Sequence, residues 1–157
     1  MKLKITELRL DKLNEKYELK LFAPKQSDKT HPVAESSVSA GFPAYAENFK
    51  TDPISIDRFL INRPESSFIL KVQGESMLDA GIFPDAYIVA DTSLPPIDNR
   101  IVLVRLEDEF LVKRIRIFDN YAVLKAENSL RNYPDIRIDS SADFEIWGTV
   151  IGTFQKL

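Results

Sequence analysis

The stretch RIVLVRLEDEFLVKRIRIF, residues 100–118, consists of two runs rich in valine, isoleucine, leucine and phenylalanine, joined by the acidic pair Glu107-Asp108. Branched and aromatic residues favour strands, and a short polar pair between two such runs is typical of a turn. The stretch therefore predicts two neighbouring antiparallel strands.

Runs of the same kind continue on both sides of this stretch, and turn-forming pairs such as Pro84-Asp85 and Asp98-Asn99 separate them. They are SFILKV at 67–72, AYIVAD at 86–91, YAVLKAE at 121–127 and FEIWGTVIGTF at 144–154. A chain with many short strands and few helical segments favours a mostly antiparallel β body.

Before these strands, the pattern predicts one short helix and an extended arm. In DPISIDRFLINR, residues 52–63, Asp52 is expected to cap a helix whose first residue is Pro53. Residues 1–40 combine short lysine-rich segments with a polar stretch that has neither a helical nor a strand period. We therefore expect an N-terminal arm at 1–40 and a globular body at 41–157.

The composition is that of one ordinary globular domain. The chain has 157 residues, of which 44% are hydrophobic and 29% are charged. It has no cysteine, so disulfides and thiolate metal sites are excluded. The apolar runs are far shorter than the roughly 20 residues that span a bilayer. The sequence therefore predicts a cytoplasmic protein without a membrane segment.

The charge distribution argues against direct DNA binding by the body. Residues 1–40 carry 8 basic and 6 acidic groups, whereas residues 41–157 carry 13 basic and 18 acidic groups. Affinity for nucleic acid depends on basic side chains that neutralise phosphates. We therefore expect no direct sequence-specific DNA binding. The five glycines are scattered and form no phosphate-binding loop, so the sequence predicts no nucleotide cofactor.

Ser76, in the segment KVQGESMLDAG at residues 71–81, is a candidate nucleophile. A serine hydroxyl attacks efficiently only when a neighbouring base takes its proton, and this base is usually histidine. The chain has one histidine, His31, in the arm, and Leu78 stands where a nucleophile elbow has its second glycine. These residues do not favour a Ser-His-Asp triad, and they leave too few ligands for zinc.

Lys113 is the remaining candidate base. The two-residue period of a strand predicts one aliphatic row that contains, besides Lys113, Leu111, Ile115 and Ile117. Burial can lower a lysine pKa by several units from about 10.4, so that the amine accepts a proton near neutral pH. In the alternative interpretation, Lys113 extends from a strand edge into solvent and Ser76 is an ordinary turn hydroxyl.

Other side chains near these two have structural interpretations. Arg114 and Arg116 fall on the strand face opposite the lysine row, which is typical of a solvated face or, alternatively, of a contact with a partner. Met77 is expected to pack at the wall of a cleft beside Ser76. Trp147 is interpreted as a core residue or as part of a dimer interface.

Four short motifs follow one another along the chain: SAGFP at 39–43, GESM at 74–77, FLVKRI at 110–115 and WGTVIG at 147–152. Together they resemble the LexA/UmuD family of self-cleaving Ser-Lys proteins. The similarity covers nearly all of residues 40–157. The order of the motifs makes it specific, since each motif alone is a weak signal.

The resemblance implies a compact antiparallel β body of the LexA/UmuD C-terminal type and assigns roles to individual residues. Ser76 matches the family's nucleophile and Lys113 its general base. Ala40-Gly41 matches the bond that is cut, so the resemblance implies an autoproteolytic serine peptidase. Val38, two residues before the bond, would be an apolar anchor.

The chemistry implied by this resemblance needs neither a cofactor nor a metal ion. Neutral Lys113 would accept the proton of Ser76 while Ser76 attacks the carbonyl of Ala40. Backbone N–H groups of Gly74, Glu75 and Ser76 would stabilise the negative charge on the oxygen.

The short arm points to the UmuD branch of the family. LexA-like repressors carry a helix-turn-helix domain before the cleavage site, and 40 lysine-rich residues interrupted by proline do not predict one. UmuD assists a Y-family translesion DNA polymerase of the UmuC type in SOS mutagenesis, after a RecA filament on single-stranded DNA stimulates its cleavage. The resemblance therefore implies a homodimer with these two partners. The arm is longer than is usual for UmuD.

Two other functions fit parts of the pattern. A non-catalytic polymerase-binding module would keep the fold without the activity. Type I signal peptidases also use a Ser-Lys dyad with a Ser-Met motif, but they need a membrane anchor, which this sequence does not predict. Cleavage of the purified protein at alkaline pH would distinguish the peptidase from the non-catalytic module.

Overall fold

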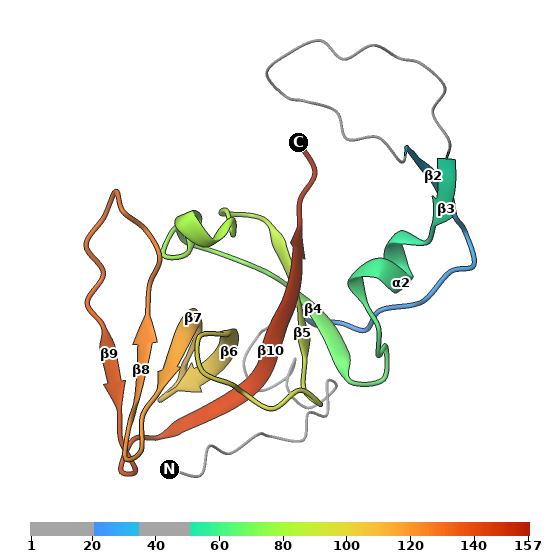
Figure 1. Ribbon diagram of the computed structural model, residues 1–157. Helices are drawn as coiled ribbons and strands as arrows, with labels where there is room; N and C mark the ends of the chain where they lie inside the picture. The colour runs from blue at the N-terminus through green and yellow to red at the C-terminus, as the bar shows by residue number, and fades with distance from the viewer. Residues whose placement is uncertain (1–20, 35–50) are drawn as a thin grey trace.

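The structure is a computed structural model of the chain, and it describes residues 21–34 and 51–157. These residues form an eight-stranded sheet of order β1-β4-β5-β10-β6-β7-β8-β9 and a two-stranded sheet of β2 and β3 (Figure 1). The strands are β1 (Leu21–Phe22), β2 (His31–Ala34), β3 (Thr51–Ile54), β4 (Ser67–Lys71), β5 (Tyr87–Asp91), β6 (Ile101–Leu106), β7 (Glu109–Ile117), β8 (Ala122–Lys125), β9 (Ile136–Ile138) and β10 (Phe144–Phe154). All pairings are antiparallel, so the predicted fold class is confirmed.

The six runs that predicted strands all form strands, and the stretch at 100–118 is the β6–β7 hairpin. In this hairpin Leu106 pairs with Glu109, and Glu107 in the turn has a φ of 54°. This left-handed conformation is uncommon outside glycine and is found mainly in turns. The three-residue strand β9 was not predicted, because its sequence IRI is too short to show a period.

A short helix is present, but it begins later than predicted. The helix α2 (Ile56–Leu60) is capped by Ser55, whose hydroxyl accepts a hydrogen bond from the N–H of Arg58 at 3.4 Å. Asp52-Pro53 lies instead in β3, where Pro53 pairs with Pro32 of β2. The predicted cap was wrong because a strand partner 21 positions away is invisible to a local pattern. No helix in the described residues has the length and hydropathy to cross a membrane.

The described part of the predicted arm, residues 21–34, contacts the body. Leu21 in β1 pairs with Leu70 in β4, and the side-chain amide of Gln26 donates to the carbonyl of Ile61 at 3.1 Å. The N–H of Ser27 donates to the carboxylate of Asp57 at 2.9 Å. The arm therefore adds an edge strand to the sheet. The boundary between residues 40 and 41 lies outside the described residues and stays a prediction.

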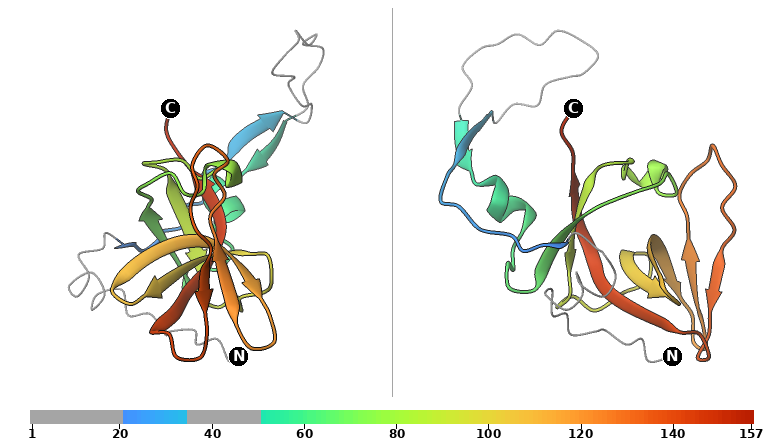
Figure 2. Two further views of the ribbon diagram at one scale, coloured as in Figure 1. Left: turned by 90° about the vertical axis from the view of Figure 1, so that its left-hand side faces the viewer. Right: turned by 180° about the vertical axis from the view of Figure 1, so that it is seen from behind.

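The long strand β10 connects the two halves of the sheet. Its residues 144–149 pair with β6 and its residues 149–154 pair with β5, with register shifts next to Gly148 and Gly152. Figures 1 and 2 show β10 crossing the body between β4 and β5 on one side and β6 to β9 on the other. Trp147 is 1% exposed and belongs to one core cluster, so it is a core residue. Ile115, Leu124 and Ile146 belong to a second cluster under β6 to β9.

Candidate active site

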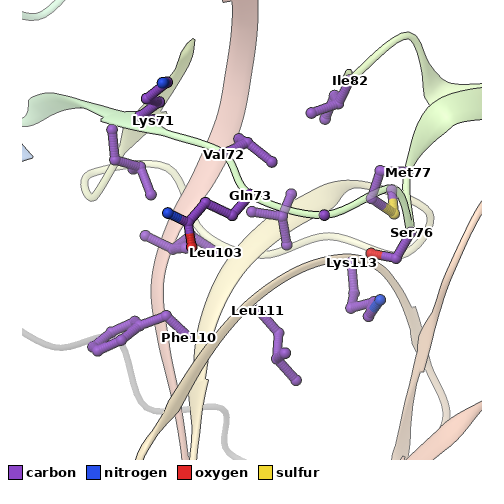
Figure 3. Close-up of a pocket in the computed structure, with 13 residues that line it drawn as sticks. Lys71, Val72, Gln73, Ser76, Met77, Ile82, Leu103, Phe110, Leu111 and Lys113 are labelled. Carbon is purple, nitrogen blue, oxygen red and sulfur yellow. The ribbon is translucent and has the colours of Figure 1, made fainter. Parts of the chain in front are cut away.

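A pocket of about 560 Å³ lies between the segment that follows β4 and strand β7 (Figure 3). Its lining includes Ser76 and Lys113, which are 37 positions apart in the sequence. Figure 3 shows the Ser76 and Lys113 side chains at the same end of the pocket. The fold therefore brings the two predicted catalytic residues together. Ala40, Gly41 and Val38 lie outside the described residues.

The segment that carries Ser76 is shaped by a glycine turn and anchored by a buried methionine. Gly74 has a φ of 84°, in the left-handed region that glycine adopts without strain. Met77 is 2% exposed and packs in the core cluster around Trp147, as expected for the wall of a cleft. The short 3-10 helix η1 (Leu78–Ala80) follows. Ser76 is thus a half-buried residue beside a rigid anchor.

Lys113 is buried in the row that its strand period predicted. Its exposed fraction is 7%, and Ile115 in the same row is fully buried. Burial lowers the pKa of Lys113, because the ammonium loses hydration. The ring of Tyr133, whose centroid is 5.4 Å from Nζ, favours the charged form and acts against this effect. The burial rules out the interpretation in which Lys113 extends into solvent.

The part of β7 that lines the pocket is a sheet edge among the described strands. On one side β7 pairs with β6 from Glu109 to Arg114, and on the other side its ladder with β8 runs from Arg114 to Ile117. No described strand therefore pairs with Leu111–Lys113 on the side of β8. An open strand edge can bind an extended peptide through backbone hydrogen bonds.

A second segment, residues 127–131, is hydrogen-bonded to the segment that carries Ser76. The N–H of Glu127 donates to the carbonyl of Ser76 at 2.8 Å, and the side-chain amide of Asn128 donates to the carbonyl of Glu75 at 2.7 Å. The guanidinium of Arg114 binds the Glu127 carboxylate with two hydrogen bonds. Arg114 is therefore paired and half-buried, and its interpretation as part of a solvated face was wrong.

Glu127 and Asn128 were missed by the sequence reasoning. Asn128 is 53 positions from Glu75, and the motif around Ser76 contains nothing that identifies a distant partner. The only local signal is a polar Glu-Asn-Ser triplet at the end of a predicted strand, which is ordinary turn chemistry. The contact therefore became visible only in the folded chain.

The chain is similar to known proteins over most of its length. The family model described as Peptidase S24-like matches residues 32–151, which include Ser76 and Lys113. The LexA repressor of Anaeromyxobacter dehalogenans is 30% identical over 120 residues, which are 76% of this chain and 53% of the repressor. The chain thus spans about half the length of that repressor. Protein SamA of Salmonella typhimurium is 27% identical over 140 residues, which are 88% of this chain and 96% of SamA. Protein MucA of the same organism is 27% identical over 133 residues, which are 83% of this chain and 89% of MucA.

Proposed function

Because this chain belongs to the peptidase S24-like family, we propose that it cleaves itself between Ala40 and Gly41, with Ser76 as nucleophile and Lys113 as general base. One observation carries the proposal: a serine hydroxyl and a buried lysine from separate elements line the same pocket. Burial keeps a fraction of the lysine neutral at lower pH than usual, and a neutral amine can take the serine proton.

The first half of the reaction forms an ester. Lys113 accepts the Ser76 proton while the serine oxygen attacks the carbonyl carbon of Ala40. Backbone N–H groups in the Gly74 to Ser76 segment stabilise the negative oxygen of the tetrahedral intermediate. The Lys113 ammonium then gives its proton to the nitrogen of Gly41, and the peptide bond breaks. Ala40 is left esterified to Ser76.

The second half of the reaction is hydrolysis of this ester. Lys113, neutral again, takes a proton from water, and the hydroxide attacks the Ala40 carbonyl. The ester bond breaks, Ser76 regains its proton from Lys113, and residues 1–40 end in a free carboxylate. Since β2 ends at Ala34 and pairs with Thr51 of β3, the bond lies in the connection between two paired strands. We propose that this connection reaches the pocket as an extended segment along Leu111–Lys113.

We further propose that the protein acts in the cytoplasm in SOS mutagenesis, as UmuD does. In this role a RecA filament on single-stranded DNA raises the population in which residues 38–41 are docked, without adding a catalytic group. The cleaved homodimer then serves a Y-family polymerase of the UmuC type. The alignment with SamA over 96% of its length supports this proposal.

The test is intact-mass measurement of the purified protein after incubation at pH near 10, and separately at neutral pH with a RecA filament on single-stranded DNA. We expect a fragment that begins at Gly41 in both cases, and none from Ser76→Ala. A different new N-terminus would show that the assigned bond is wrong. An intact chain under every condition would favour the non-catalytic polymerase-binding module.

A further inference from the structure

The peptide bond between Glu75 and Ser76 is held from one side by Asn128. The Asn128 Nδ2 group donates a hydrogen bond to the Glu75 carbonyl at 2.7 Å. In a trans peptide the carbonyl and the following N–H point in opposite directions, and no described peptide bond is cis. The N–H of Ser76 is therefore directed away from Asn128. Ser76 lines the pocket and Asn128 does not.

The next peptide bond is held by the same segment. The Ser76 carbonyl accepts from the N–H of Glu127 at 2.8 Å, and the Glu127 carbonyl accepts from the N–H of Asp79 at 2.9 Å. The Asp79 carboxylate in turn accepts from the N–H of Ser129 at 2.6 Å. The two peptides that flank the candidate nucleophile are thus both bound to residues 127–128.

The orientation of the Asn128 side chain is itself determined by its surroundings. Its Oδ1 atom accepts from the N–H of Leu130 at 2.9 Å and from the N–H of Arg131 at 3.3 Å. These two donors require an oxygen on that side of the amide, so the NH₂ group faces Glu75. Glu127, the preceding residue, is bound by Arg114, the neighbour of Lys113 on β7. The residues that bind the Ser76 peptide are therefore linked, through Glu127 and Arg114, to β7, the strand that carries Lys113.

From this geometry we propose that Asn128 is a positioning residue for self-cleavage: it holds the Glu75–Ser76 peptide so that the Ser76 N–H points at the developing oxyanion of Ala40. This inference rests on the proposed function and adds a residue that acts through the peptide rather than on the substrate. Oxyanion donors are effective because they are oriented before the charge develops. A Glu75–Ser76 peptide without its Asn128 partner would rotate and lose this orientation.

The experiment compares the full-length wild type with Asn128→Ala, Asn128→Asp and the control Asn132→Asp. First-order self-cleavage rates are measured by intact mass across alkaline pH, at a temperature well below the melting temperature of each variant. In Asn128→Asp the carboxylate still accepts from Leu130 but cannot donate to Glu75. Asn132→Asp adds the same charge at an exposed position directly after residues 127–131.

We expect the rate at the high-pH plateau to fall about 10- to 100-fold in both Asn128 variants. This is a smaller decrease than the complete removal of an oxyanion donor causes. The pH midpoint of Asn128→Ala should equal that of the wild type, because Lys113 stays buried. Asn132→Asp should keep the wild-type plateau. If Asn128→Ala does not fold, the plateau rate of Asn128→Asp tests the proposal.

Two results would overturn the positioning role and leave the Ser-Lys chemistry standing. One is a plateau rate of self-cleavage in the folded Asn128 variants that equals the plateau rate of the wild type. The other is a pH midpoint of self-cleavage in Asn128→Ala that moves toward the ordinary lysine pKa. This would mean that Asn128 acts by excluding water from Lys113. A wild type that never cleaves would instead refute the proposed function, and this inference with it.

Discussion

Lys113 is 7% exposed, in a row with the buried Ile115, and the pKa of its amine is lowered by this burial. A lysine in such a place lowers stability at neutral pH, because the ammonium must give up water and no carboxylate of the described residues pairs with it. The aliphatic period around it was visible in the sequence. Its proximity to Ser76 was not, because the two residues come from separate elements.

Replacement of Lys113 by arginine tests whether the residue acts as a base. We expect Lys113→Arg to fold and to be as inactive in self-cleavage as Ser76→Ala and Lys113→Ala, because a guanidinium keeps its charge and cannot accept a proton. Intact mass at pH near 10 measures the activity, and a thermal melt checks the fold. A folded arginine variant that cleaves at the wild-type rate would exclude Lys113 as the general base.

Replacement of Lys113 by methionine tests the cost of its burial. The pKa of Lys113 is lower in the folded chain than in the unfolded chain, so the unfolded chain binds more protons at pH values between the two. Stability therefore rises with pH through this window. We expect Lys113→Met to melt at a higher temperature than the wild type at pH 7, with a gain that shrinks toward pH about 10.4. A gain that does not vary with pH would point to packing instead.

At the scale of elements, β10 depends on close contact with β5 at one glycine. A Cβ atom added at Gly148 would lie 3.2 Å from the Ala90 Cβ and 3.3 Å from the Asp91 carbonyl oxygen, both on a buried strand. At Gly152 the nearest atom is the flexible end of Leu60, at an ordinary contact distance of 3.5 Å. The two glycines of one strand therefore differ in how much space they have.

This difference predicts opposite effects for the same substitution. We expect Gly148→Ala to lower the free energy of unfolding by about 1–2 kcal/mol, since overpacking of a filled site forces its neighbours apart. Gly152→Ala should leave it unchanged or raise it by about 0.5 kcal/mol, through lower entropy of the unfolded chain. Urea denaturation measures both variants. Equal stabilities would show that β5 and β10 can separate at Gly148 without cost.

For the whole molecule, the core lies in the predicted body. Every buried member of the two core clusters comes from Phe68 or later in the chain. The described part of the arm contributes the edge strand β1 and the strand β2, whose partner is β3. The described part of the arm thus contacts the body without supplying its core clusters.

Removal of residues 1–40 tests this division. We expect the chain 41–157 to fold and dimerise, with a β-type circular dichroism spectrum and a cooperative melt only a few degrees below that of the full chain. Most of the stabilising apolar burial is retained, because both clusters remain. Analytical ultracentrifugation measures the oligomeric state. An unfolded truncated chain would mean that the arm belongs to the core and that the boundary is wrong.

The sequence by itself determined six of the ten described strands and the two candidate catalytic residues. The strands follow from local properties, namely apolar runs and turn formers, and the two-residue period placed Lys113 in an aliphatic row. The roles of Ser76 and Lys113 came from the resemblance of the motifs. Only the tertiary structure decided where the helix is capped, how β1 to β3 pair, that Ser76 and Lys113 line one pocket, and that Asn128 binds the peptide before Ser76. These features depend on hydrogen bonds and burial between residues tens of positions apart, for which a local pattern carries no signal.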